Sequence, residues 1–220
     1  MKRLLTNRRM LTLGLATAAL TGGIAGPALA TDTTTANTTA TAAAAPAAVT
    51  QAVEKSVEHQ FQLQETGYYC APAATRVALT AQQHNLNQDT VADKLATTTD
   101  GTDSITQVTD TLNTELGTTA YTTVELPNPD TTDEQTTTFK ADVTAALDAG
   151  EIVVANIVGT ATDTNGEAHT YAGGHYIPIV GYTDNGDTLM IADTSGKGTA
   201  HYQIATTDMA DWMATRGYTA

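Results

Sequence analysis

The chain has 220 residues with 24 acidic and 10 basic side chains, and its formal net charge of −14 argues against nucleic acid and anionic membranes as partners. Its length suits at most about one globular domain once an export signal is set aside. Cys70 is the only cysteine, so an internal disulfide is excluded and the hydrophobic core must stabilise the fold.

Residues 1–30 have the pattern of a cleaved export signal. A basic start containing Arg8-Arg9 precedes an apolar stretch that ends in Ala28-Leu29-Ala30, and both the general secretory route and the twin-arginine route remain open. Because four of the ten basic residues and no acid lie in this segment, its removal leaves a charge of −18. We therefore expect a secreted, or cell-wall-associated, protein without membrane insertion of the mature chain.

The composition changes twice after this segment. Positions 31–50 hold eight Thr and eight Ala with no aromatic residue, which predicts a disordered linker over residues 31–53, either a glycosylated segment or a spacer. Aromatic residues and regular periodicity begin after Glu54. This change predicts one folded domain over residues 54–220.

The first half of this domain has helical periodicity. Three helices are predicted first, with Asp89 and Ser104 as the N-caps of the second and third: Ala71–Asn85, Asp89–Thr97 and Ser104–Leu116. A short strand, a polar loop and a helix closed by Gly150 follow: Tyr121–Leu126, Pro127–Thr138 and Phe139–Ala149.

The last third of the chain changes to β-rich runs, and Asn185-Gly186 between the second and third runs predicts a tight hairpin. The predicted strands are Ile152–Val158, His175–Tyr182, Leu189–Asp193 and His201–Ala205. A closing helical turn is expected at Met209–Ala214. A helical half followed by an antiparallel sheet predicts the α+β class.

Cys70 lies directly before the first predicted helix. Positive potential and unpaired N–H groups at a helix N-terminus stabilise a thiolate, which is the nucleophilic form of cysteine. A free cysteine can equally be a small buried core residue. Position alone leaves both interpretations open.

The residues around Cys70 resemble those of a known family. Gln64 lies six residues before Cys70, and the helix starts with Cys70-Ala71-Pro72-Ala73. This pattern resembles the papain-like cysteine peptidases, specifically their bacteriocin-leader, or double-glycine, branch. The resemblance implies a papain-like domain in which the Gln64 side chain and the Cys70 backbone N–H stabilise an oxyanion. Gln60 and Gln62 lie nearby, and only the spacing separates them from Gln64.

A second part of the resemblance is Gly173-Gly174-His175, followed by an apolar run to Gly181-Tyr182. It is similar to a strand of the same family that carries the catalytic histidine. The resemblance implies that His175 is the general base for the Cys70 thiol. The glycines before it would allow close approach of a substrate or of the cysteine helix.

Asp193 is the third expected member of the site. It lies eighteen residues after His175, at the end of the strand that the hairpin pairs with the His175 strand, and its carboxylate could orient the imidazole. The family usually has Asp-Pro here, whereas this chain has Asp193-Thr194. Asp184 and Asp187 are alternatives, but we expect the turn to hold them away from His175. The resemblance spans about residues 58–206.

The other histidines have no spacing typical of a metal site, so we expect surface or loop positions, no metal and no cofactor; they are His59, His84, His169 and His201. Trp212 and Tyr218 are expected to pack against the sheet. Tyr171 and Tyr176 flank His175 and are candidates for lining the cleft.

The leading functional hypothesis is a secreted thiol peptidase, a monomer that cleaves a peptide or protein substrate with Cys70, His175, Asp193 and Gln64. Three alternatives remain: acyl or amide transfer through the same thioester, a cell-wall endopeptidase of related fold, and a non-enzymatic surface binding module. Asp193 fits the endopeptidase less well, because such enzymes usually carry a second histidine there. The substrate is not defined by the sequence.

Overall fold

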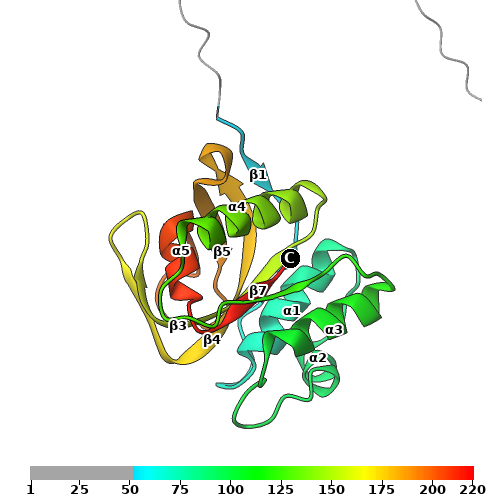
Figure 1. The fold of residues 1–220 in the computed structure, drawn as a ribbon. Helices are drawn as coiled ribbons and strands as arrows, with labels where there is room; N and C mark the ends of the chain where they lie inside the picture. The colour runs from blue at the N-terminus through cyan, green and yellow to red at the C-terminus, as the bar shows by residue number, and fades with distance from the viewer. Residues whose placement is uncertain (1–51) are drawn as a thin grey trace, which may run out of the picture. The chain divides into compact units, whose positions relative to one another are not determined.

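The computed structural model describes residues 52–220 (Figure 1), so the export signal and all but the last two residues of the predicted linker lie outside the described residues. The first half contains three helices close to their predicted positions: α1 (Cys70–Ala81), α2 (Gln88–Lys94) and α3 (Ile105–Leu116). Cys70 is the first residue of α1, as its position before the apolar periodicity predicted.

Helix caps explain where α2 and α3 begin. Ser104 and Gln107 form a capping box at the start of α3, which confirms Ser104 as its cap. Asp89 was wrong as the cap of α2: the Asn87 side chain accepts the Thr90 backbone N–H there. Asp89 lies within the first turn instead, where its carboxylate accepts the Tyr69 hydroxyl.

Helix α4 (Asp133–Asp148) begins six residues earlier than Phe139, so the predicted loop over 127–138 was wrong in its second half. Thr132 and Gln135 form a second capping box, and Asp133 and Glu134 occupy the first turn, where acidic side chains are favourable. Those residues are polar, so hydrophobic periodicity alone could not find this turn. The helix ends at Asp148, one residue before the predicted end at Ala149, and Gly150 closes it as predicted with a φ of +84°.

One sheet contains every strand that the structure describes, and every strand pair in it is antiparallel. Its order is β2-β7-β3-β4-β5-β6, and β1 pairs with β4 off this path. The strands are β1 (Lys55–Ser56), β2 (Thr123–Glu125), β3 (Val153–Thr162), β4 (Ala168–Thr183), β5 (Thr188–Ala192), β6 (His201–Ala205) and β7 (Gly217–Thr219). Asn185-Gly186 lies in the 3-10 turn between β4 and β5, which confirms the predicted hairpin.

The β3–β4 hairpin is longer than the sequence predicted. Residues 159–162 and 168–174 extend both strands, around a turn that contains Asn165-Gly166, the same dipeptide signal as at 185–186. A bulge interrupts this ladder: Ile157 pairs with His175, but Gly159 pairs with Tyr171. Four residue positions of β4 therefore lie opposite two positions of β3.

Two helical groups lie on either side of this sheet (Figure 1). Helices α1, α2 and α3 contact one another, whereas α4 and α5 (Thr206–Trp212) contact each other and the sheet strands. Residues 153–157 of β3 are all buried, as expected of a strand covered on both faces. Trp212 of α5 is buried against the sheet as predicted, whereas Tyr218 is part of the sheet, in β7, with its ring against Phe139 of α4. The α+β class is confirmed. None of the helices in residues 52–220 has the length and apolarity needed to cross a membrane.

Candidate active site

Cys70 meets His175 where the start of α1 packs against β4. The thiol is partly buried, and the His175 imidazole and the backbone N–H groups of Ala71 and Tyr176 lie close enough to the sulfur to lower its pKa. One of these N–H groups belongs to the first turn of α1. A partly buried sulfur with three donors can carry negative charge.

These contacts determine the pKa of the thiol. Burial of Cys70 raises its pKa, but the His175 hydrogen bond, the charge of the imidazolium and the two backbone N–H groups together lower it below the ordinary value. The pKa of His175 moves the opposite way: burial lowers it, and Asp193 and Cys70 together raise it above the ordinary value. Both shifts favour a thiolate–imidazolium pair over the two neutral groups.

His175 and Asp193 form a buried pair. The imidazole Nε2 lies 3.0 Å from Oδ1 of Asp193, and their side chains are only 4% and 1% exposed. Because Nε2 is engaged with the carboxylate, Nδ1 is the ring atom left for Cys70. The order thiol, imidazole, carboxylate is the arrangement that activates a nucleophile and keeps the base in one tautomer.

Asp193 accepts hydrogen bonds on both oxygens. Besides His175, Oδ1 accepts the Ser195 backbone N–H at 2.8 Å, while Oδ2 accepts the hydroxyls of Tyr171 at 2.6 Å and Tyr202 at 3.3 Å. Burial raises the pKa of Asp193, yet the hydrogen bonds and charge of its partners lower it to about 2. The carboxylate therefore stays ionised at neutral pH.

The two alternative acids lie elsewhere. Asp187 pairs with Lys140 of α4 at 2.6 Å, and Asp184 accepts the hydroxyls of Thr183 and Thr188 in the turn. Of these three acids, only Asp193 is hydrogen-bonded to His175.

Gln64 is held beside the segment that follows Asp193, and none of the hydrogen bonds of the described residues joins its side chain to Cys70. Its backbone N–H donates to the Thr194 carbonyl at 2.8 Å, which places it beside the segment that follows Asp193. Its Nε2 donates to the Thr66 carbonyl at 2.7 Å, and its Oε1 is buried without a hydrogen-bond partner among the described residues. An amide nitrogen has two N–H groups, so one donor remains for a substrate.

A cavity that is open to solvent contains Cys70 and His175. It is also lined by residues from the 100–103 loop, β3, the bulge before His175 and the residue before β7: Asp100, Gly101, Thr102, Asp103, Asn156, Gly173, Gly174, Tyr176 and Arg216. Tyr176 thus lines the cavity as expected, whereas Tyr171 is buried behind His175. Asn156 and Arg216 reach the site through sheet pairing, which no local sequence signal reveals.

The prediction that His169 is a surface or loop residue was wrong, because it is buried in β4. Its Nε2 lies 3.3 Å from Asp163, and its ring stacks on Tyr202 with centroids 3.8 Å apart. Asp163, Glu167 and His169 form the one group of potential metal ligands found among residues 52–220, around the hairpin turn. Asp163 already accepts two backbone N–H groups besides facing His169, so these contacts satisfy it without an ion.

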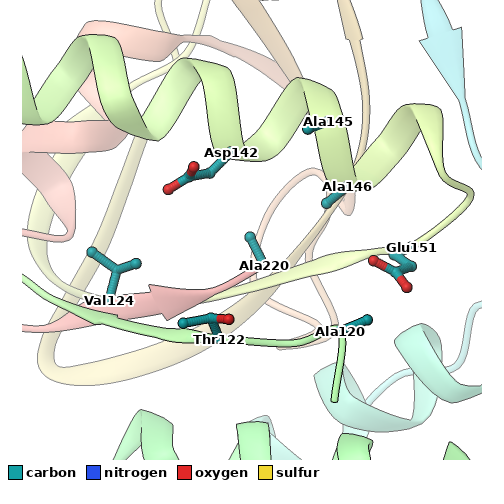
Figure 2. Close-up of a pocket in the computed structure, with 8 residues that line it drawn as sticks. All are labelled: Ala120, Thr122, Val124, Asp142, Ala145, Ala146, Glu151 and Ala220. Atoms are coloured by element: carbon teal, nitrogen blue, oxygen red, sulfur yellow. The ribbon is translucent and has the colours of Figure 1, made fainter. Parts of the chain in front are cut away.

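A larger pocket lies apart from the candidate site. Figure 2 shows Asp142, Ala145 and Ala146 of α4 facing Ala120, Thr122, Val124 and Ala220 across it, with Glu151 at one end. Asp142 already accepts the Tyr218 hydroxyl at 2.6 Å. Neither the thiol nor the imidazole of the candidate site lines this pocket.

Comparison with known proteins gives one family and two structures. The model of the Peptidase_C39 like family matches residues 54–220. The crystal structure of the peptidase domain of Streptococcus ComA, a bi-functional ABC transporter involved in a quorum sensing pathway, is similar with 12% identity, a TM-score of 0.49, and coverage of 73% of this chain and 96% of that chain. The crystal structure of a double glycine motif protease from an AMS/PCAT transporter, in complex with the leader peptide, has 11% identity, a TM-score of 0.46, and coverage of 77% and 96%. No curated protein matches the chain.

Proposed function

We propose that this chain, which belongs to the Peptidase_C39 like family, is a thiol peptidase whose nucleophile is Cys70. The observation that carries this proposal is that Cys70 and His175 share one cavity and that His175 is hydrogen-bonded to the buried Asp193. A binding module would need neither a lowered thiol pKa nor a buried acid oriented on the histidine.

In the proposed reaction, the Cys70 thiolate attacks the carbonyl carbon of a peptide bond, and the carbonyl electron pair moves to the oxygen. His175, which holds the former thiol proton, donates it to the departing amine nitrogen as the C–N bond breaks. Water then attacks the thioester with His175 as base, which releases the carboxylic acid and restores the thiol. Asp193 stays ionised and keeps the imidazole aligned throughout.

The oxyanion would be stabilised by the Cys70 backbone N–H and the free N–H of Gln64. Two facts support this role for Gln64: it is tied to the Thr194 carbonyl beside the acid, and one of its amide N–H groups is anchored on Thr66. The second N–H is then available with the side chain already oriented.

The proposed substrate is a peptide or protein that enters the cavity of Cys70 and His175. Gly101, Gly173 and Gly174 leave its walls free of side chains at three positions, which suits an extended main chain. The basic and apolar pattern of residues 1–30 supports a site of action outside the cytoplasm.

The rate of Cys70 alkylation by iodoacetamide against pH tests this proposal without a known substrate. We expect the wild-type protein to react at pH 6.5 at least about tenfold faster than His175→Ala, because an ordinary thiol with a pKa near 8.5 is about 1% ionised there. The two rates should converge near pH 10. His201→Ala, which removes an exposed histidine of β6, is the matched control and should react like the wild type.

Cleavage of a peptide library would then identify the substrate class, with Cys70→Ala as the inactive control. The proposal is wrong if the wild type and His175→Ala have the same alkylation profile. It is also wrong if Cys70→Ala still cleaves the peptides.

A further inference from the structure

Tyr171 contacts two members of the proposed triad at once, a fact that the triad itself does not explain. Its hydroxyl donates to Oδ2 of Asp193 at 2.6 Å, and its ring stacks on the His175 imidazole with centroids 4.1 Å apart and planes inclined by 17°. The hydroxyl also lies 2.7 Å from the Ser195 hydroxyl. The side chain is therefore held at both its ring and its polar end.

We propose that Tyr171 is a positioning residue that holds the Asp193 carboxylate and the His175 imidazole in the mutual orientation needed to receive the Cys70 proton. This inference rests on the proposed function. Tyr171 does not line the cavity of Cys70, so it acts through its two neighbours and not on the substrate.

The bulge of β4 makes this arrangement possible. In a regular strand, residues four positions apart lie about 13 Å apart, too far for their rings to stack. Here Tyr171 and His175 pair with Gly159 and Ile157, only two positions apart on β3. Gly174 takes up the extra length with a φ of +88°, so the two rings become neighbours on one face.

The two contacts fix different motions. Asp193 binds only the edge of the imidazole, so this hydrogen bond alone would let the ring tilt. The Tyr171 ring packs against one face of the imidazole and restricts this tilt. The Tyr171 hydroxyl in turn binds the Asp193 oxygen that His175 does not use. Rotation of the carboxylate would break this charge-assisted bond, which is stronger than a neutral one.

Several charged and titratable groups surround the pair, and Asp100, Asp103 and Arg216 line the cavity that Cys70 and His175 share. Cys70 faces it from α1, Tyr202 from β6, and the Lys197 ammonium lies 5.6 Å from the centroid of the Tyr171 ring. Burial and the Asp193 hydrogen bond raise the pKa of Tyr171 above its ordinary value, which is itself well above neutral pH. Its hydroxyl therefore remains a donor over the whole working range.

Tyr202 offers a matched control. It donates to the same Oδ2 of Asp193, but at 3.3 Å, and its ring stacks on His169 instead of His175. Tyr171→Phe and Tyr202→Phe each remove one hydroxyl that donates a hydrogen bond to Oδ2 of Asp193, and each keeps the aromatic ring. Only Tyr171→Phe removes the short bond of the side chain that covers the imidazole.

The first measurement is the pH profile of Cys70 alkylation. We expect Tyr171→Phe to lower the rate at pH 6.5 about tenfold and to leave the rate near pH 10 unchanged, because a misaligned imidazole stabilises the thiolate less. Tyr202→Phe should change the rate less than about twofold at either pH. An unchanged Tyr171→Phe profile, or an equal loss at both pH values, overturns the inference.

The second measurement is independent of the thiol. In the Cys70→Ala background, NMR titration of the His175 ring should give a pKa lower by at least about 0.5 unit when Tyr171→Phe is added, because the carboxylate then turns away from the imidazole. If the wild-type alkylation profile is that of an unperturbed thiol, the proposed function is wrong. The NMR titration would still test whether Tyr171 positions the His175 imidazole. A His175 pKa that stays constant or rises overturns the positioning role.

Discussion

At the scale of single residues, the segment after Asp193 shows how hydrogen bonds can replace a rigid proline. The resemblance placed Asp-Pro where this chain has Asp193-Thr194. The Asp193 N–H donates to the Ala200 carbonyl at 2.7 Å, and the Thr194 carbonyl accepts the Gln64 N–H at 2.8 Å. The Ser195 N–H closes a turn onto the Asp193 carboxylate itself. These bonds fix the backbone on both sides of the acid, so the missing proline does not leave it loose.

The charge of Asp193 can be tested by replacing it with asparagine. An amide presents either its oxygen or its nitrogen to His175 and cannot stabilise an imidazolium as a carboxylate does, so we expect peptide cleavage to fall on the order of 10³-fold. Asp187→Asn, in the exposed turn, is the control and should retain wild-type cleavage. Comparable activity in Asp193→Asn and the wild type would exclude Asp193 as the orienting acid.

At the scale of elements, two local features position the site: the start of α1 and the bulge of β4. The first orients Cys70 with the N–H of Ala71 at its sulfur, and the second turns His175 toward it. The glycines before His175 were expected to allow close approach. Gly174 is also needed for its positive φ of +88°, and a Cβ there would meet only ordinary contacts within the protein.

Alanine at each of the two neighbouring glycines separates these explanations. Gly174→Ala should lower the free energy of unfolding by about 1–3 kcal/mol, because a φ of +88° is strained for an L-residue. Gly173→Ala should change it by less than about 0.5 kcal/mol, since its backbone is ordinary and its Cβ would meet open space. Denaturant unfolding measures both, and equal losses would contradict the role assigned to the bulge.

At the scale of the whole molecule, the buried pair of His175 and Asp193 joins β4 to the segment between β5 and β6. Its contribution to stability depends on pH in two directions. The depressed pKa of Asp193 contributes stability above its unfolded value near 3.9, and this is lost as the pH falls toward 2. The raised pKa of His175 contributes stability below about 6.5, and this is lost as the pH rises through its folded value.

The difference in unfolding free energy between the wild type and Asp193→Asn should therefore be greatest between about pH 4 and pH 6.5, and on the order of 2 kcal/mol. It should shrink on both sides of this window. Chemical denaturation at a series of pH values measures the difference, and a constant gap from pH 3 to pH 9 would contradict an ionised pair.

The sequence alone determined the features that depend on a few neighbouring residues. Cys70 at the start of a helix, the cap at Ser104, the hairpin at Asn185-Gly186 and the strand His201–Ala205 all follow from local spacing and turn chemistry. The same signals were present but missed at Thr132-Gln135 and at Asn165-Gly166, where polar residues hid the ends of α4 and of the β3–β4 hairpin.

Only the tertiary structure decided which distant residues meet. β1 and β7 have two and three residues and exist only because other strands pair with them. The burial of His169, the reach of Asn156 and Arg216 into the cavity, and the stack of Tyr171 on His175 depend on strand register. Register is determined by the whole sheet and by one bulge, and a shift of one residue would turn every side chain to the other face. The pattern around Cys70 could therefore indicate a candidate chemistry, but only the fold could show how the His175 imidazole is held.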